Sequence, residues 1–471
     1  MRRLYVRSSL CGFATVAVTT LVVGFNSSGQ SVSPPGEEEI GCVAPDEWFQ
    51  PDGTKEASYT VDLNPDNDCD FYRFAWQTFL FVTDSPKGST APRFLGFATP
   101  DEVFGQGATP TFAKRAAKDE LILSPRVIKP KGVRNIDTVF QAISEGVLVD
   151  QNGRSLYYGL HMNDAFVSFI KNNNLTTPDG IAKAPATLMF EPGCIEFKSA
   201  WRVVPAGEDA SGFITRMAKL PTLAMKDGKV IIDPSQPSRV ENVVLVGLHV
   251  VGVAKGHPEF IWATFEHIKN TPDLPANLLN FDSSGAELSK SANPVTDEAW
   301  TFCPKGALAK DCNVLNKGTV HIVDPQKQTL APITPIFRHF AFGGDNPRGV
   351  ASLNASVHAK LSATDVHRNY EMIGAVWLQA PLDHNGQMGS FVEGKTFPDD
   401  VLAGATRLSS SIMETFTQNT PGEKNCLQCH NTDRVDVPGT SVSLPGKRIN
   451  VSHMILRAYG HGKQLEQKNK K

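Results

Sequence analysis

Near the end of the chain, two cysteines and a histidine stand in the order Cys426-Leu427-Gln428-Cys429-His430. Thiols at this spacing can each add to one vinyl group of haem, and the adjacent imidazole can ligate the iron. With only 8 Cys and 12 His among 471 residues, a chance occurrence of the pattern is improbable. We therefore predict one covalently bound haem c, attached at Cys426 and Cys429, with His430 as the proximal iron ligand.

Two other chemistries stay open for these residues. A Cys-x-x-Cys pair can close into a disulfide, or it can supply half of a four-ligand zinc site. No other two cysteines of the chain lie so close together in the sequence, so a second half for a zinc site is not apparent. Haem attachment is therefore the preferred interpretation.

The second axial ligand of the iron has several candidates. His453 and Met454 are neighbours that follow the motif, and a methionine sulfur raises the reduction potential of haem, whereas a second imidazole lowers it. Adjacent residues on a regular element point in different directions, so only one of the two can face the iron. Met454 is alternatively an ordinary core residue. Met388, Met413 or His461, or no protein ligand at all, are the remaining possibilities.

The N-terminus has the order of a secretory signal peptide, which we assign to residues 1–29. Arg2, Arg3 and Arg7 precede an apolar stretch over 10–25, and small polar residues follow it. The apolar stretch is shorter than the ~20 residues that span a bilayer comfortably. We expect an exported, soluble, periplasmic protein that contacts a membrane only if the signal is not cleaved. Bacteria attach haem c in that same oxidising compartment, where disulfides persist.

The charge of the chain limits the classes of partner that it can bind. A net charge of −3 with 20% charged residues gives no broad field of either sign, so nucleic acid is not an expected partner.

Five further cysteines follow the signal. Our first choice for a disulfide is Cys303 with Cys312, and our second is Cys42 with Cys69. Cys194 is then a buried free thiol.

Hydrophobic periodicity divides the chain into regions. Residues 30–68 are expected to be an extended leader, and 70–82 a buried helix. Strands are predicted at 121–127, 155–160, 187–190, 195–204, 230–232, 243–254, 259–265 and 319–323, with short helices at 136–144 and 164–171. Helical spacing returns at 353–361, 365–377 and 408–416. The run 243–253 is apolar on both faces, which is typical of a central strand in a covered sheet.

These regions predict an α+β protein. A large, sandwich-like, β-rich domain with interspersed helices would cover 69–400, and a short, mostly helical, cytochrome c-like haem module would cover 401–471 and pack against it. Only 41 residues follow His430. That is too few to wrap a haem alone, since a free-standing module of this kind needs about 80 to 120 residues. We expect the β-rich domain to cover part of the haem.

Six polar residues lie within the predicted strands: Glu196, Lys198, Arg202, His249, Glu266 and His267. A second metal or acid–base site is one interpretation, in particular for His249, Glu266 and His267. The other is a buried network in which Glu196 pairs with Arg202 or Lys198 and His249 donates to a backbone carbonyl. The network is favoured because the sequence contains no recognisable metal-binding spacing.

Four further segments carry a resemblance to a family: Ala75-Trp76-Gln77-Thr78-Phe79, Leu248-His249-Val250-Val251-Gly252, Trp262-Ala263-Thr264-Phe265-Glu266-His267 and Leu408-Ser409-Ser410-Ser411-Ile412-Met413-Glu414-Thr415-Phe416. Together with the haem motif, they make the chain similar to the exported single-haem proteins of the cytochrome c family. The resemblance implies a haem-binding, electron-transferring protein and specifies no substrate.

Three functions follow from these expectations. The first is an exported c-type cytochrome, an electron carrier or redox module that docks a redox partner protein. The second is a haem-dependent oxidoreductase that activates peroxide or oxygen, with its substrate held by the β-rich domain. A scaffold with a purely structural haem is the third. The single attachment motif argues against a di-haem peroxidase, and whether the protein is an enzyme stays open, with the carrier preferred.

Overall fold

The structure is a computed structural model that describes residues 41–468, apart from 51–52, 61–62, 65, 106–116, 118, 126–146, 276–277, 279–290, 316–318, 344–346, 383–388, 419–424 and 438–439. The expected signal peptide, the expected helix at 136–144 and the ligand candidate Met388 lie outside the described residues.

The described helices are mostly short, and two of them reach 16 residues. The α-helices are α1 (Asp68–Thr83), α2 (Pro100–Phe104), α4 (Asp164–Asn172), α5 (Pro178–Lys183), α6 (Pro347–Lys360), α7 (Cys426–Cys429) and α8 (His453–Lys468). Single 3₁₀ turns are η1 (Asp46–Phe49), η2 (Arg93–Gly96), η5 (Ala309–Asp311), η6 (Ala341–Gly343), η7 (Val366–Asn369), η8 (Asp399–Val401) and η9 (Arg448–Val451).

The strands of the main sheet are β1 (Leu121–Ile122), β2 (Ser124–Pro125), β3 (Tyr157–Met162), β4 (Ile195–Val203), β5 (Thr215–Leu220), β8 (Arg239–Ala254), β9 (His257–His267), β12 (Tyr370–Leu378) and β13 (Leu402–Gly404). Three two-stranded ribbons pair β6 (Leu223–Lys226) with β7 (Lys229–Ile232), β10 (His321–Asp324) with β11 (Thr329–Ala331), and β14 (Val435–Asp436) with β15 (Ser443–Leu444).

One nine-stranded sheet organises the described residues. Its order is β13-β12-β9-β8-β4-β3-β2, and β5 pairs with both β8 and β1. All these pairings are antiparallel except β1 with β5. The α+β class is therefore confirmed. The described strands build a single covered sheet with small ribbons, and not the two large facing sheets that a sandwich would have.

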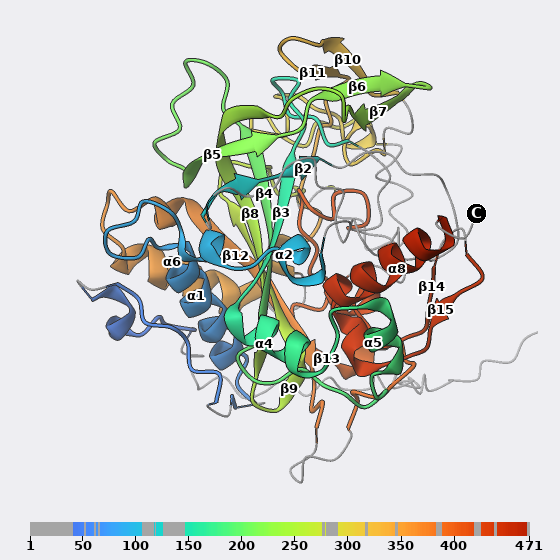
Figure 1. The fold of residues 1–471 in the computed structure, drawn as a ribbon. Coiled ribbons are helices and arrows are strands. Elements are labelled where there is room, and N and C mark those ends of the chain that lie inside the picture. Colours follow the sequence, from blue (N-terminus) through green and yellow to red (C-terminus); the bar gives the residue numbers. More distant parts are fainter. Residues whose placement is uncertain are drawn as a thin grey trace, which may run out of the picture. The chain divides into compact units, whose positions relative to one another are not determined.

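Each face of the sheet has its own apolar cluster, because successive side chains of a strand point to opposite faces. On β4, Phe197 belongs to the cluster under α1 and α6, whereas its neighbours Glu196 and Lys198 face the other way. On β9, Trp262 belongs to the second cluster, together with the C-terminal segment and α4. Figure 1 shows α1 and α6 on one side of the strands, and α5 and α8 on the other. The predicted motif therefore packs against one defined face of the sheet.

Helix α1 forms as its periodicity predicts, and it covers the first of these faces. The Asn67 side chain caps it by accepting a hydrogen bond from the backbone of Cys69. Phe79 stacks on Phe265 of β9, with ring centroids 4.1 Å apart. Trp76 is fully buried and donates to Asn354 of α6 over 2.8 Å. Aromatic packing joins α1 to the sheet, and the hydrogen bond of the Trp76 indole joins α1 to α6.

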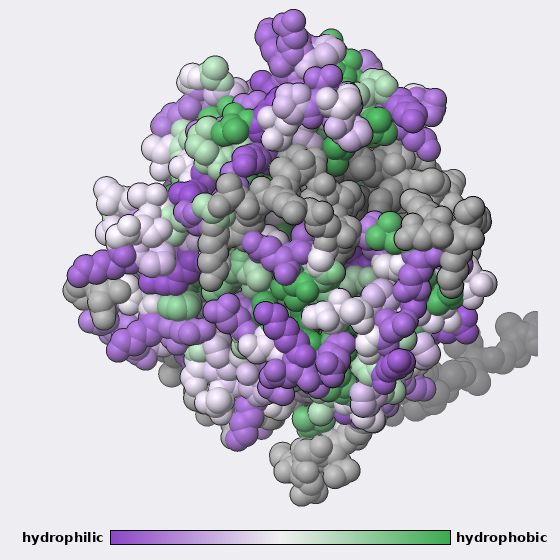
Figure 2. Space-filling model, viewed as in Figure 1, coloured by the Kyte–Doolittle hydropathy of each residue, from purple (hydrophilic) through white to green (hydrophobic). Residues whose placement is uncertain are grey.

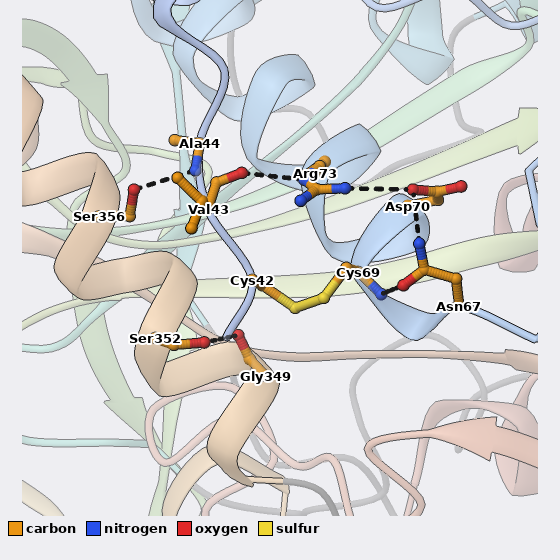
Figure 3. Close-up of a disulfide and its surroundings, with 10 residues drawn as sticks. All are labelled: Cys42, Val43, Ala44, Asn67, Cys69, Asp70, Arg73, Gly349, Ser352 and Ser356. Carbon is orange, nitrogen blue, oxygen red and sulfur yellow. Dashed lines mark hydrogen bonds and ion pairs between the residues drawn. A yellow bond between two sulfur atoms is a disulfide. The ribbon is translucent and has the colours of Figure 1, made fainter. Parts of the chain in front are cut away.

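The segment before α1 is fastened to the body, although we expected an extended leader there. A disulfide joins Cys42 to Cys69, the second residue of α1 (Figure 3). Arg73 donates to the carbonyl of Val43 over 2.9 Å, and the Ser356 hydroxyl accepts from the backbone of Ala44 over 3.0 Å. Trp48 is buried in the main cluster. Cross-link, hydrogen bonds and burial fix the described part of this segment.

The structure does not contain the disulfide that was our first choice, Cys303 with Cys312. Cys303 and Cys312 are free thiols in the structure, buried and hydrogen-bonded to each other through their side chains. The disulfide in the structure is the second choice, Cys42 with Cys69. Cys194 is a buried free thiol, as predicted.

The predicted elements are confirmed where periodicity is unambiguous. Strands β3, β4, β8 and β9 and helices α4 and α6 lie at the predicted places, and β8 is central as expected. Residues 187–190 form no strand. We expected a helix at 365–377, but residues 370–378 are strand β12, because an apolar run buried on both faces fits either element.

The stretch at 408–416 is also not the helix that we predicted, but a series of turns. The Ser410 hydroxyl accepts hydrogen bonds from the backbone of Ile412 and Met413. The Thr415 hydroxyl donates to the carbonyl of Ser411. Local hydrogen bonds of Ser and Thr compete with those of a regular helix.

The surface shows no dominant apolar area in the view of Figure 2. Purple, hydrophilic residues are spread over that face among pale ones, and green residues appear in smaller groups between them. The large exposed apolar side chains of the described residues are scattered through the sequence, from Val43 to Leu465. None of the described helices has the length and the apolar character needed to cross a membrane.

Candidate haem attachment site

The motif forms one short helical turn, α7, with its cysteines at the first and last positions. Residues three apart lie on the same side of a helix, so the two thiols share one face. Asn425 caps the turn: its side chain accepts from the backbone of Gln428 over 3.2 Å and donates to the carbonyl of Thr406 over 2.9 Å. Leu427, between the cysteines in the sequence, is fully buried in the second apolar cluster. The turn is therefore held by its cap and by the burial of one of its own side chains.

The imidazole of His430 is enclosed on both of its faces. The indole of Trp262, from β9, lies against one face with ring centroids 4.0 Å apart. His453, the first residue of α8, stacks on His430 with centroids 3.5 Å apart and planes inclined by 21°. Aromatic contacts of this kind fix the plane of the ring.

A hydrogen bond fixes the rotation of the same ring. Nδ1 of His430 lies 2.9 Å from the carbonyl oxygen of Val451, to which it donates. The other nitrogen, Nε2, is then the one available as a metal ligand. An Nδ1–H bonded to a backbone carbonyl is the usual support of a metal-ligating histidine.

The surroundings keep His430 neutral. Burial lowers its pKa to about 3, and Lys198 and His249 lower it further, while the Val451 carbonyl and Glu414 act in the opposite direction. Only the neutral imidazole has a lone pair for a metal. His430 is thus in the form that ligation requires at every ordinary pH.

The thiols of Cys426 and Cys429 are half-buried and form no disulfide in the structure. Burial raises the pKa of the Cys426 thiol, and the negative charge of Glu414 raises it further. A site that disfavours thiolates suits sulfurs that end as uncharged thioethers. The disulfide alternative receives no support, because the structure does not join these two cysteines.

The residues present fit a covalently attached haem. Two sulfurs share one face of a turn, and the adjacent imidazole has its Nδ1 occupied, its plane fixed and its charge suppressed. Within the described ranges, no group of three or more His, Cys, Asp or Glu side chains is arranged to hold a metal ion. The zinc alternative therefore also receives no support.

The candidates for the second axial ligand have different places. Stacked rings cannot ligate one iron from opposite sides of a porphyrin, so His453 would have to turn away from His430 to do so. Its Nε2 lies 3.4 Å from the carbonyl of Cys429. Met454 is buried in the apolar cluster beneath the motif, as the core interpretation predicts. Met413 packs in another cluster, beside Ile412, and His461 lies on α8, eight residues after His453.

Two buried carboxylates attach the C-terminal third of the chain to the sheet. Glu196 of β4 accepts a hydrogen bond from the Ser452 hydroxyl over 2.6 Å. Ser452 stands between Val451 and His453 in the sequence. Glu266 of β9 accepts from the hydroxyl groups of Ser410 and Ser411, each over 2.6 Å. Burial raises the pKa of Glu196 to about 7, and it also raises that of Glu266. Both contacts hold segments that flank the motif.

Lys198, His249 and Glu414 form a third contact, which we call the polar cluster. Lys198 and His249 are direct partners across β4 and β8, and His249 is the partner of Thr264 across β8 and β9. Nδ1 of His249 lies 2.9 Å from the Thr264 hydroxyl, and its Nε2 lies 3.2 Å from the carboxylate of Glu414. The ammonium of Lys198 lies 3.5 Å from that carboxylate.

The polar residues predicted in the strands therefore belong to hydrogen-bonded networks, with partners that we did not anticipate. Glu196 pairs with Ser452, and Arg202 pairs with Glu208, where we expected Glu196 to pair with Arg202 or Lys198. His249 contacts a carboxylate and a hydroxyl, where we expected a backbone carbonyl. The partners come from distant segments, which spacing along the sequence cannot reveal. His249, Glu266 and His267 do not gather into one site.

His267 illustrates this dispersal. Its Nε2 donates to the carbonyl of Gly212 over 3.1 Å, and its ring stacks on Phe213 with centroids 3.7 Å apart. Burial lowers its pKa to about 4. His267 is a packed, neutral core residue.

Sequence reasoning missed three contributors to the site: the covering ring of Trp262, the accepting carbonyl of Val451 and the carboxylate of Glu414. A backbone carbonyl leaves no trace in the residue type. Trp262 and Glu414 stand in segments that we noted for a predicted strand, a predicted helix and the family resemblance, none of which marks these two side chains as site residues. Comparison of the chain with family profiles, with curated proteins and with solved structures gave no match.

Proposed function

We propose that this chain is an exported c-type cytochrome, which binds one haem covalently and passes single electrons to or from a redox partner protein. The observation that carries the proposal is the arrangement of His430. Its ring lies between Trp262 and His453, and its Nδ1 is bonded to Val451, so Nε2 is left for an iron. Cys426 and Cys429 lie on the adjacent turn.

The bound group would supply the redox chemistry, since haem iron alternates between its ferric and ferrous states. The residues of the chain supply attachment and orientation. Cys426 and Cys429 would form the two thioether bonds, and His430 would ligate the iron. Trp262 and the Val451 carbonyl would hold the imidazole in one orientation, which limits the rearrangement that each electron transfer requires. The segment 401–471 would be the haem module, completed by β4, β8 and β9.

Export and attachment are tested together by producing the full chain in a bacterium that has a haem c maturation system. The expected product is a coloured periplasmic protein whose mass exceeds that of the processed polypeptide by one haem. Cys426→Ala and Cys429→Ala are each expected to reduce covalent attachment. Cys194→Ala is the matched control, because it removes a buried thiol outside the motif. A colourless product with the mass of the bare polypeptide would contradict the proposal.

The absorption spectrum then separates a carrier from an oxidoreductase. A carrier is expected to have a six-coordinate, low-spin haem whose spectrum carbon monoxide leaves unchanged. A high-spin ferric haem that binds small ligands would instead favour the peroxide- or oxygen-activating enzyme. His430→Ala is expected to abolish the normal spectrum while the sheet stays folded, as judged by circular dichroism, because the larger apolar cluster lies on the other face of the sheet.

A further inference from the structure

The polar cluster of Lys198, His249 and Glu414 lies on the same sheet face as the site. Lys198, His249 and Thr264 stand in one row across β4, β8 and β9. Trp262, which contacts the His430 ring, is two residues before Thr264 on β9, so both side chains point to the same face. Strand geometry puts ~7 Å between such positions. The cluster and the proximal histidine are therefore neighbours on one surface.

The charges of the cluster reach the motif. Lys198 and His249 both lower the pKa of His430, and Glu414 raises it. Glu414 raises the pKa of Cys426, and Lys198 lowers it. These effects connect the cluster with both the attachment position and the ligand position of the proposed haem.

The cluster is also built to keep its charges in place. Glu414 accepts from the backbone of Ser410 over 3.1 Å, in addition to its contacts with His249 and Lys198. The side chains of Lys198 and Glu414 are only 23% and 21% exposed, so solvent screens their charges less than it screens charges on the open surface. A fixed, poorly screened charge beside a redox centre alters the free energy of adding an electron.

We propose that Lys198 and Glu414 set the reduction potential of the haem by opposing charges, with His249 holding the Glu414 carboxylate in position. This inference rests on the proposed function and deepens it. Transfer of one electron from the redox partner to a bound haem would lower the net charge of the haem by one unit, and no bond would form or break. A negative carboxylate nearby disfavours that change, and a positive ammonium favours it.

The test is a redox titration of the purified holoprotein, with Glu414→Gln and Lys198→Met as separate variants. Glu414→Gln is expected to raise the reduction potential, and Lys198→Met is expected to lower it. His249→Gln is expected to shift the potential less than Glu414→Gln does, because it removes a partner of the carboxylate and not the charge. The two opposite signs distinguish electrostatic control from general damage to the pocket.

A matched control is available in the ion pair between Lys219 and Glu120, whose nitrogen and oxygen lie 2.5 Å apart. Its side chains are 28% and 22% exposed, much like those of the cluster. Neither charge is among the largest influences on the pKa of Cys426 or His430. Lys219→Met and Glu120→Gln are expected to leave the potential unchanged.

Haem content, measured first, separates the two hypotheses. If the wild-type chain carries no haem, the proposed function fails. If haem is present, three results would show that the cluster does not set the potential. Both cluster variants could keep the wild-type potential, shift it in the same direction, or shift it no more than the control variants do. In each case the proposed function still stands. Should Glu414→Gln fail to retain haem, the sign of the Lys198→Met shift decides the question.

Discussion

Nδ1 of His430 lies 2.9 Å from the carbonyl oxygen of Val451, a residue that lies 21 positions later in the chain. This hydrogen bond joins the motif at α7 to the turn η9 that precedes α8. It fixes which nitrogen of the ring carries the proton, because the carbonyl can only accept. The orientation of the proposed iron ligand thus depends on the backbone carbonyl of Val451. No side-chain substitution removes this carbonyl, so the orientation is tested through the other residues that contact the His430 ring.

Trp262→Ala tests the aromatic cover of His430. Loss of a buried indole is expected to cost about 3 to 5 kcal/mol of unfolding free energy. It is also expected to change the spectrum of the ferric haem, because the imidazole loses one of its two ring contacts. Trp48→Ala is the control, since Trp48 is equally buried but lies in the cluster on the other face of the sheet. Equal spectra for the two variants would show that Trp262 contributes packing alone.

Replacing both cysteines of the Cys42–Cys69 disulfide by alanine is expected to lower the free energy of unfolding by about 3 to 4 kcal/mol, because the unfolded chain is no longer closed over a separation of 27 residues. Urea denaturation with and without a reductant measures the effect. Wild type is expected to lose a similar amount on reduction, and the double variant is expected to be insensitive to it. Identical transitions of oxidised and reduced wild type would refute the role of this cross-link.

Glu196→Gln tests the buried carboxyl that accepts the Ser452 hydroxyl. Burial raises the pKa of Glu196 from 4.5 to about 7, so between these values the unfolded chain releases its proton first. Wild-type stability is therefore expected to fall as the pH rises through this window, by on the order of 3 kcal/mol in all, and it is undiminished by this group below about pH 4.5, where the carboxyl is protonated in both states.

The measurement compares wild type with Glu196→Gln by urea denaturation at pH 4.5 and pH 8. Glutamine does not titrate, so the variant is expected to gain stability relative to wild type as the pH rises. The comparison cancels all other titrating groups. A stability difference that does not vary with pH would show that Glu196 is ionised in the folded chain as readily as in the unfolded one.

Gly247→Ala tests how closely the segment after β13 packs on β8. A Cβ at Gly247 would lie 2.6 Å from Cδ1 of Ile412 and 3.1 Å from Cε of Met413. Overpacking of this kind is expected to cost about 1 to 3 kcal/mol, measured by thermal or urea unfolding. Gly96→Ala is the control, because nothing lies within 4 Å of its added Cβ. A fully stable Gly247→Ala chain would mean that Ile412 and Met413 are free to move.

The sheet was predictable where apolar and polar residues alternate, or where a run that is apolar on both faces is also rich in β-branched valine. The run at 243–253 predicts a central strand, and β8 pairs with β4, β5 and β9. The strand β12 was not predictable in the same way, because an apolar run such as Tyr370–Leu378 carries no signal that separates a buried strand from a buried helix. Its neighbours in the sheet decide between the two.

The candidate site could be predicted only in its local part. Cys426, Cys429 and His430 are contiguous, so their relationship is visible in the sequence. Trp262 and Glu414 reach the site through strand register and through turns, and both depend on long-range contacts. The prediction of a helix at 408–416 was wrong for the same reason, long-range contacts. Ser410 and Ser411 bind Glu266, and Ser410 also binds local backbone groups, in place of continuing a helix.

The order of the elements along the chain has a consequence for biosynthesis. β12, the last long strand of the sheet, ends at Leu378, and the motif begins only at Cys426. A ribosome therefore delivers the docking surface before it delivers the thiols, and Val451 emerges later still. In the exported cytochrome that we propose, haem attachment and closure of the last turns onto the sheet would compete for the same stretch of chain, and slow closure would lengthen the time in which the cysteines stay accessible.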